Sequence, residues 1–164
     1  MQVFQSPLAG DVSAQLGDKN QKFVHGGNDP WAMDRRSSGE DKGYDEAKAI
    51  IAGLHRTGGV IDETIKIVTH SMGGAYGKGY VEGLKRYIKE NGLEKDVRIT
   101  LVVDFDSFQA ESIKADDDIK TMEFIHYGSI ANQKEKGKSV DIRKTNTAGD
   151  DAKKHSILVF CRCR

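Results

Sequence analysis

Cysteine is scarce in this chain of 164 residues, because only Cys161 and Cys163 occur, one position apart near the end of the sequence. So close a pair, with no further cysteine or histidine at ligand spacing, excludes a disulfide framework and makes a poor zinc site. We expect this end of the chain to be a frayed tail without function. A chain of this length buries a core without disulfides, so we expect one domain over residues 1–164.

An excess of charge of either sign is also missing, since 25 basic and 25 acidic residues cancel. No long-range field therefore attracts nucleic acid or an anionic membrane, and we expect neither as a partner. The apolar runs are far shorter than the roughly 20 residues that a membrane-spanning helix needs. We therefore expect no transmembrane segment.

A secretory signal is absent from the start of the sequence, which lacks a basic segment followed by a continuous apolar centre. Either the protein is not exported by that route and is cytoplasmic, or the sequence is a delivered piece of a longer chain. Residues 1–20 are expected to be a linker or the remnant of a longer region.

Hydrophobic periodicity predicts strands and helices in alternation. Strands are expected at residues 22–25, 63–70, 97–105 and 121–128, and helices at residues 44–56 and from the glycines at 73–74 to Asn91 and Gly92. Polar loops are expected up to Gly43 and at residues 133–154. This order implies an α/β fold with a mostly parallel sheet and helices on both faces. In such sheets, ligand sites gather beyond the carboxyl ends of the strands.

The stretch THSMGG, at residues 69–74, stands where a predicted strand meets a predicted helix. So abrupt a turn forces Ser71 into a strained conformation and lifts its side chain clear of the sheet. The Met72 N–H would lie at the start of the helix, where unpaired donors and the helix dipole favour a developing negative charge. The common pattern for such a serine is G-x-S-x-G, and Thr69 in place of the first glycine is a departure from it.

Phosphate-binding patterns do not fit the same glycines. A phosphate loop requires glycine at Met72 and serine or threonine at Gly79, and a dinucleotide fingerprint requires glycine at Glu82. The turn therefore favours acyl transfer over anion binding.

Together with its neighbours, this turn resembles the nucleophile elbow of the α/β-hydrolase family of lipases and esterases, whose usual form is GHSMGG. FVHGG at residues 23–27 is similar to the family's His-Gly segment, DFDSF at residues 104–108 to its acid-bearing strand end, and KKHSI at residues 153–157 to its late histidine segment. The resemblance implies a compact three-layer α/β-hydrolase-like fold. It also implies a serine hydrolase that cleaves carboxylic esters, such as lipids or phospholipids, through an acyl-enzyme.

The resemblance also assigns roles to individual residues. Ser71 would be the nucleophile, His155 the base and Asp106 the acid, with Asp104 as the reserve acid and His126 as the reserve base. The oxyanion hole would be formed by backbone N–H groups of Met72, Gly26 and Gly27. The substrate pocket would be lined by Trp31 and Phe108. This interpretation needs no cofactor and no metal.

Two other interpretations remain open at this stage. The chain could be a non-catalytic binding domain with a hydrolase-like fold, and the discriminating feature is whether His155 reaches Ser71. Asp104 and Asp106 could instead be a metal-binding pair of a nucleotide-sugar transferase, although no phosphate-binding segment accompanies them. The shortness of the chain suggests a hydrolase carried at the C-terminus of a bacterial toxin, with an immunity protein as partner.

Overall fold

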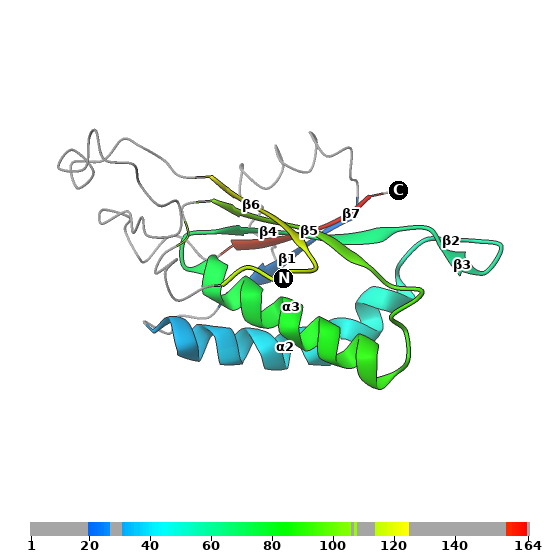
Figure 1. Cartoon of the computed structure of the whole chain (residues 1–164), viewed down its shortest axis with the longest axis horizontal. Coiled ribbons are helices and arrows are strands. Elements are labelled where there is room, and N and C mark those ends of the chain that lie inside the picture. Colours follow the sequence, from blue (N-terminus) through cyan, green and yellow to red (C-terminus); the bar gives the residue numbers. More distant parts are fainter. Residues whose placement is uncertain (1–19, 27–30, 106, 108–113, 125–156, 164) are drawn as a thin grey trace, which may run out of the picture.

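The computed structural model describes residues 20–26, 31–105, 107, 114–124 and 157–163. In this part of the chain a five-stranded sheet carries two long helices on one face (Figure 1). The strands are β1 (Asn20–His25), β4 (Thr64–His70), β5 (Ile99–Phe105), β6 (Lys120–Phe124) and β7 (Ile157–Cys163). The helices are α2 (Ala32–Ala52) and α3 (Gly73–Glu90), and a short hairpin joins β2 (Arg56–Thr57) to β3 (Val60–Ile61).

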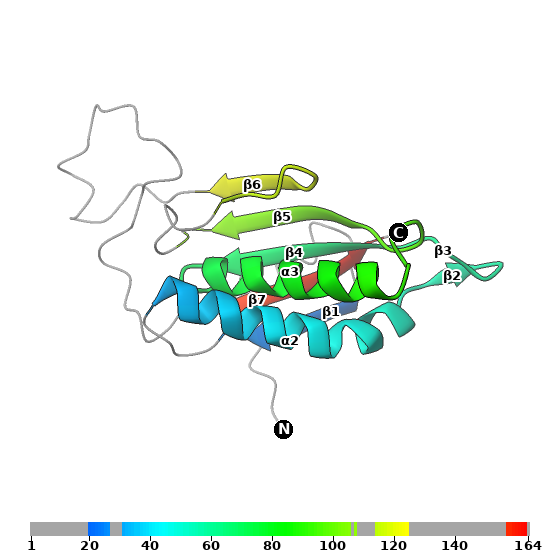
Figure 2. The ribbon, with the colours of Figure 1, turned by 60° about the horizontal axis from the view of Figure 1, so that its bottom comes forward.

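The order of strands across the sheet is β1-β7-β4-β5-β6 (Figure 2). Strands β4, β5 and β6 are parallel neighbours, whereas β7 runs antiparallel to both β1 and β4. Strand β1 therefore points the same way as β4. The carboxyl ends of β1, β4, β5 and β6 lie at one edge of the sheet, together with the amino end of β7.

The mixed α/β content and the parallel pairing of β4, β5 and β6 confirm the coarse prediction, and the predicted strands at 22–25, 63–70 and 97–105 are all present. The strand expected at 121–128 is present as β6, and its last four residues lie outside the described residues. Both described helices cover the same face of the sheet (Figure 1). A third layer on the other face stays a prediction.

The expectation of a frayed cysteine-bearing tail was wrong. Cys161 and Cys163 belong to β7, which lies inside the sheet and pairs with β1 on one side and β4 on the other. The apolar run at residues 157–160 is the signal for this strand, and pairing on both sides gives its backbone groups hydrogen-bond partners.

The first helix begins twelve residues earlier than predicted, at Ala32, and the segment assigned to a loop up to Gly43 is helical. Glycine lowers helix propensity, but here it permits close packing of two helices. A Cβ added at Gly39 or Gly43 would overlap the backbone of α3, and one added at Gly79 or Gly83 would overlap the backbone of α2. Each helix therefore presents a pair of glycines four residues apart to the other.

The end of this helix also differs from the prediction. It stops at Ala52, with Gly53 as its C-cap, and Gly58 and Gly59 instead form the turn of the β2–β3 hairpin with φ of +60° and +87°. The end of α3 agrees with the sequence, because Asn91 is its C-cap and Gly92 has φ of +65°.

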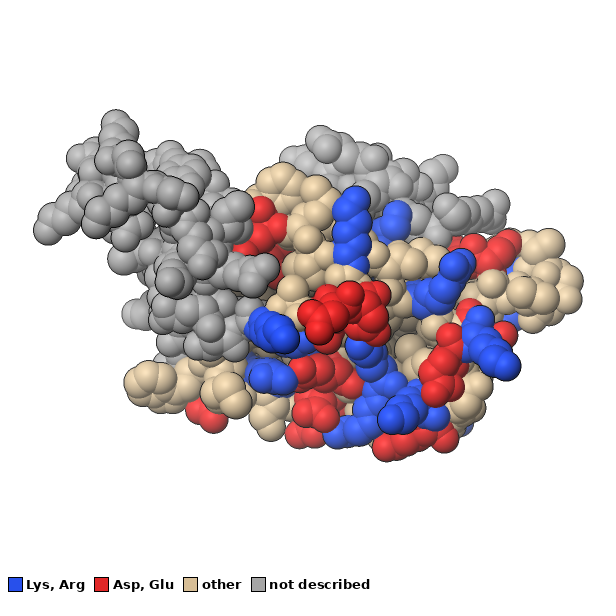
Figure 3. Space-filling view, viewed as in Figure 1, with Lys and Arg blue, Asp and Glu red and all other residues tan. Residues whose placement is uncertain are grey.

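The core lies between the helices and the sheet. Residues that are 0 % exposed there include Ala47, Ile65, Ile67, Tyr80 and Leu84. On the outer side of the helix pair, charged groups of both signs are interleaved (Figure 3). No helix in the described part of the chain has the length and apolar character to cross a bilayer.

Ion pairs join the outer sides of the two helices. Arg36 donates to both carboxylate oxygens of Glu82 at 2.8 and 2.5 Å, and Arg86 donates to Glu40 at 2.5 Å. Because each pair joins α2 to α3, these contacts fix the alignment of the two helices alongside the glycine contacts.

Candidate active site

Ser71 lies between the last residue of β4 and the first turn of α3, where the sequence places the abrupt turn. Its φ is +53°, and it is the one residue other than glycine with a positive φ in the described part of the chain. This left-handed conformation costs a residue with a side chain about 1–2 kcal/mol. The turn is held by two hydrogen bonds: the Ser71 N–H donates to the Phe105 carbonyl at 2.8 Å, and the Gly74 N–H donates to the Ser71 carbonyl at 3.2 Å.

The hydroxyl of Ser71 is buried and has no hydrogen-bond partner among the described residues. The residue is 1 % exposed, and Ser107, at 3 % exposed, is the other described residue with a buried side-chain oxygen lacking a partner. An unsatisfied buried hydroxyl costs about 1–3 kcal/mol, so such groups are rare in native structures. Ser71 therefore has two features that cost free energy, a left-handed backbone conformation and a buried hydroxyl that is unpaired within the described residues.

Arg35 fixes the residue that follows the serine. Its side chain is completely buried, at 0 % exposed, and its Nε donates to the Met72 carbonyl oxygen at 3.1 Å. Arg35 lies in the first turn of α2, where its own N–H donates to the Trp31 carbonyl at 3.1 Å. The start of α2 is thereby bound to the start of α3, and Met72 already has helical φ and ψ of −61° and −19°.

Thr69 occupies the position where a glycine is usual, and its side chain has a specific partner. Its hydroxyl donates to Oδ1 of Asp104, the residue directly opposite in the β4–β5 register. Burial raises the pKa of Asp104 to about 6, although the Thr69 hydrogen bond and the charge of Lys78 both act to lower it. Among the described residues, the Lys78 amine pairs with Asp116 at 2.8 Å and acts on Asp104 through its charge.

Gly26 lies at the same edge of the sheet, directly after β1. A Cβ at this position would be 3.1 Å from Cγ and 3.2 Å from Cβ of Tyr76, a residue in the first turns of α3. The His-Gly segment therefore contacts the helix that follows Ser71, and Gly26 has the close fit that only a glycine accepts without a shift of the tyrosine.

The ends of three neighbouring strands meet around Ser71. In the β4–β7 register Val68 faces Val159, so β7 begins at Ile157 beside the end of β4. The predicted base His155 precedes Ile157 by two positions, and the predicted acid Asp106 follows Phe105 by one. His155 and Asp106 themselves lie outside the described residues, as do His126, Gly27 and Phe108.

Large apolar side chains are exposed at this edge. Trp31 and Met33, before and in the first turn of α2, are 67 % and 63 % exposed, and Phe124 at the end of β6 is 45 % exposed. The Phe124 ring stacks on Phe105 with 5.1 Å between ring centroids. Trp31 was predicted to line a substrate pocket, and its exposure at the strands' carboxyl edge is compatible with that role.

Comparison of the chain with protein-family models, with curated proteins and with solved structures finds no match. The functional assignment therefore depends on the residues and geometry at this edge. Among the described residues, no group of three or more His, Cys, Asp or Glu side chains is placed to hold a metal ion.

Sequence reasoning missed two contributors to the site, Arg35 and the Thr69–Asp104 pair. Arg35 fell in a segment predicted to be a loop, and no apolar periodicity in residues 34–43 indicates the helix. The Thr69–Asp104 contact follows from the register of two strands, which neither strand's own sequence specifies.

Proposed function

We propose that this protein is a serine hydrolase that cleaves carboxylic esters through an acyl-enzyme at Ser71. The observation that carries the proposal is the left-handed backbone of Ser71 at a strand-to-helix turn, combined with its buried hydroxyl, which has no partner within the described residues. Local strain of this kind persists where the surrounding structure enforces it, and it is concentrated at functional sites. A core serine without a chemical role would avoid both costs.

In the proposed reaction, His155 removes the proton from Ser71 Oγ as the oxygen attacks the ester carbonyl. His155 then returns that proton to the leaving alcohol, and a water molecule releases the acid in a second, equivalent step. The order of strands supports this assignment, because β7 begins beside the end of β4. Ile157, the first residue of β7, follows His155 by two positions in the sequence, which also supports this assignment.

Asp106 is the preferred acid, and Asp104 is the substitute. Asp104 accepts the hydrogen bond of Thr69 and is 9 % exposed, which supports a role in holding β4 to β5 rather than in binding an imidazole. Asp106 follows Phe105, whose carbonyl accepts the N–H of Ser71. A carboxylate at that position would hold the His155 tautomer and stabilise its charged form.

The oxyanion of the tetrahedral intermediate would be bound by the backbone N–H of Met72 and by N–H groups of Gly26 and Gly27. Two contacts support this arrangement: Arg35 binds the Met72 carbonyl, and Gly26 packs against Tyr76. Loss of one such donor typically lowers the rate about 100- to 1,000-fold.

Esters with an apolar acyl or alcohol group, including lipids and phospholipids, are the proposed substrates. Support comes from the exposed Trp31, Met33 and Phe124 at the edge that carries Ser71. A tryptophan and a phenylalanine offer large apolar area for such a group. Delivery as a bacterial toxin domain, opposed by an immunity protein, remains part of the proposal, and a lack of growth inhibition on expression in bacteria would count against that setting.

A non-catalytic binding domain is the second candidate, favoured by the 1 % exposure of Ser71 and by Thr69 in place of glycine. Hydrolysis of a series of p-nitrophenyl esters from acetate to decanoate separates the two candidates. We expect turnover that is abolished in Ser71→Ala and His155→Ala and falls steeply in Asp106→Asn. Ser107→Ala is the matched control, because it removes the other buried unpartnered hydroxyl and should retain activity.

Turnover that persists in Ser71→Ala would exclude the proposed nucleophile. If Asp104→Asn abolishes activity while Asp106→Asn does not, the acid of the triad is Asp104. If His126→Ala abolishes activity while His155→Ala does not, the base is His126.

A further inference from the structure

Large apolar side chains are exposed to water along the edge of the molecule that carries Ser71. Trp31 and Met33, before and in the first turn of α2, are 67 % and 63 % exposed, and Phe124 at the end of β6 is 45 % exposed. Figure 2 shows the start of α2 and the carboxyl ends of β4, β5 and β6 on the same side of the molecule. We call Trp31, Met33 and Phe124 the apolar edge. Large apolar groups that are exposed together are a mark of an interaction surface.

Backbone and ring contacts place Ser71 between the two ends of the apolar edge. On the α2 side, the Arg35 N–H donates to the Trp31 carbonyl at 3.1 Å, and the Arg35 side chain binds the carbonyl of the residue after Ser71. On the β6 side, the Ser71 N–H donates to the Phe105 carbonyl at 2.8 Å, and the Phe105 ring stacks on Phe124. A surface that contacts both Trp31 and Phe124 would therefore lie next to the serine turn.

The cations in the first two turns of α2 and α3 already have partners. Arg35 is buried, and its Nε binds a backbone carbonyl. Arg36 pairs with Glu82 at 2.5 Å. Lys78 pairs with Asp116 at 2.8 Å. In this described part of the edge, no cation is left to bind an anionic surface, so the partner that fits is apolar and has no net charge.

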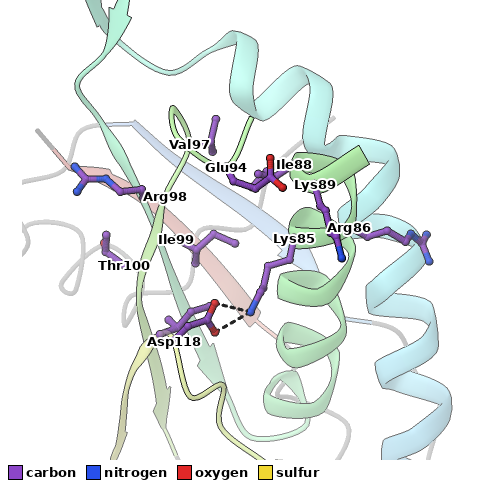
Figure 4. A pocket seen from close by; sticks show the side chains of 11 residues that line it. Lys85, Arg86, Ile88, Lys89, Glu94, Val97, Arg98, Ile99, Thr100 and Asp118 are labelled. Carbon is purple, nitrogen blue, oxygen red and sulfur yellow. Dashed lines mark hydrogen bonds and ion pairs between the residues drawn. The ribbon is translucent and has the colours of Figure 1, made fainter. Parts of the chain in front are cut away.

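The opposite end of the molecule is less suited to such a partner. A cavity of about 720 Å³ lies there between the last turns of α3 and the start of β5, partly lined by isoleucine and valine side chains (Figure 4). It is also lined by Lys85, Lys89, Glu94 and Asp118. A lipid surface at that end would have to remove these charged groups from water, which is costly. The apolar edge is therefore the side that we expect to face lipid.

We propose that the apolar edge docks on the surface of a zwitterionic phospholipid bilayer, with Trp31 and Met33 in the head-group layer. This inference rests on the proposed function, because a docked edge would bring the serine turn to the lipid esters. Tryptophan suits this layer, since its ring is apolar and its N–H can remain with polar groups. Asp34, exposed beside Met33, can approach the ammonium of a choline head and repels an anionic one.

Trp31 is the single tryptophan of the chain, so its fluorescence reports on the apolar edge alone. The vesicles are made of dialkyl ether phosphatidylcholine, whose chains contain no carboxylic ester, so docking of the unmodified protein is measured without hydrolysis. We expect vesicles to shift the emission maximum to shorter wavelength and to protect Trp31 from quenching by iodide. Raising the protein concentration without vesicles should cause neither change.

Variants locate the docking surface. Trp31→Ala combined with Met33→Ala should weaken vesicle binding, measured by flotation, about tenfold or more, because both changes remove apolar area from the contact. Val60→Ala is the matched control and should change binding less than twofold, because Val60 is also 67 % exposed but belongs to β3 at the far end of the molecule (Figure 2). All three side chains are exposed, so the fold should survive, and circular dichroism of each variant checks this.

Four results would overturn the proposal. Unchanged Trp31 fluorescence in the presence of vesicles would show that this edge does not dock. Equal flotation of the double variant and the unmodified protein would place the lipid contact elsewhere. Flotation that requires phosphatidylglycerol in the vesicles would indicate adsorption through cations. A fluorescence shift that follows protein concentration alone would assign the apolar edge to contact between copies of the chain.

Ester hydrolysis is measured separately, with p-nitrophenyl acetate in solution, so that the two proposals are distinguishable. Hydrolysis without vesicle docking would refute the docking surface and leave the proposed hydrolase. Docking without hydrolysis would support the docking surface and refute the hydrolase.

Discussion

The close packing of α2 against α3 predicts that Gly79→Ala destabilises the protein, although the same change stabilises most helices. Alanine in place of glycine in a helix interior is favourable by about 1 kcal/mol. At Gly79, however, the new Cβ would overlap the Arg36 carbonyl oxygen and lie 2.7 Å from its carbonyl carbon and 2.8 Å from the Glu40 nitrogen. These are backbone atoms, which cannot rotate away, so the helices must separate.

Overpacking typically costs about 1–3 kcal/mol, and more where the neighbour is rigid. Because the contacts at Gly79 are with backbone atoms, we expect a cost of about 3–4 kcal/mol, which the helix gain of about 1 kcal/mol reduces to a net loss of about 2–3 kcal/mol. This loss lowers the melting temperature by roughly 4–12 °C for a chain of this size. Ser37→Ala is the control, because Ser37 is an exposed residue of α2 and its replacement should leave the melting temperature unchanged or slightly raised. Thermal unfolding followed by circular dichroism measures both, and an unchanged or higher melting temperature for Gly79→Ala would refute the packing described above.

Three further predictions concern the surroundings of Ser71. Replacing Arg35 by Met removes the hydrogen bond to the Met72 carbonyl, and we expect Ser71 to react with a fluorophosphonate roughly tenfold more slowly in a chain that circular dichroism shows to be folded. An unchanged rate would mean that Arg35 does not position the turn. Thr69→Val leaves the buried Asp104 carboxylate without its hydroxyl donor, so urea unfolding should show a loss of about 1–3 kcal/mol. Because burial raises the pKa of Asp104 from 3.8 to about 6, the folded state binds the proton more tightly than the unfolded chain. The contribution of this group to stability therefore falls as pH rises from about 3, below the unfolded pKa, to about 7, above the folded pKa. Relative to Asp104→Asn, the unmodified protein should lose roughly 3 kcal/mol across that window, and a constant difference in unfolding free energy would contradict the burial of a titrating carboxyl.

Periodicity located the strands on both sides of the serine turn because their apolar residues follow regular patterns. Residues 63–70 and 97–105 are rich in β-branched and apolar types, and both form strands within two residues of the predicted limits. The same reasoning failed for the start of α2. Its glycines and charged residues predict a loop when only helix propensity is considered. In the structure these glycines contact α3, a partner that the local sequence does not reveal.

The cysteine-bearing end shows a second limit. Residues 157–160 are apolar, but closeness to the end of the sequence suggested fraying. The position of β7 inside the sheet depends on pairing with β1 and β4, which are more than 85 residues away in sequence. Long-range pairing of this kind is not encoded in the strand itself, so position in the chain is a poor guide to whether a segment joins the sheet.

At the candidate site, the turn at Ser71 was predictable because its cause is local. A strand that passes directly into a helix forces one residue into an unusual conformation, and the small residues around it permit that. The contacts of Arg35 and Asp104 were not predictable, because each joins two residues that are more than 30 positions apart in the sequence. The meeting of β4, β5 and β7 at one edge likewise comes from the topology of the sheet.

The most direct test of catalysis at Ser71 is covalent labelling by diisopropyl fluorophosphate, a probe small enough for a confined site. Intact mass and peptide mapping are measured for the unmodified protein, Ser71→Ala and Ser107→Ala. We expect one adduct, on Ser71, that is absent in Ser71→Ala and retained in Ser107→Ala. A folded protein that forms no adduct, or one that forms it on another residue, would contradict the proposed hydrolase and leave the turn at Ser71 as a structural feature.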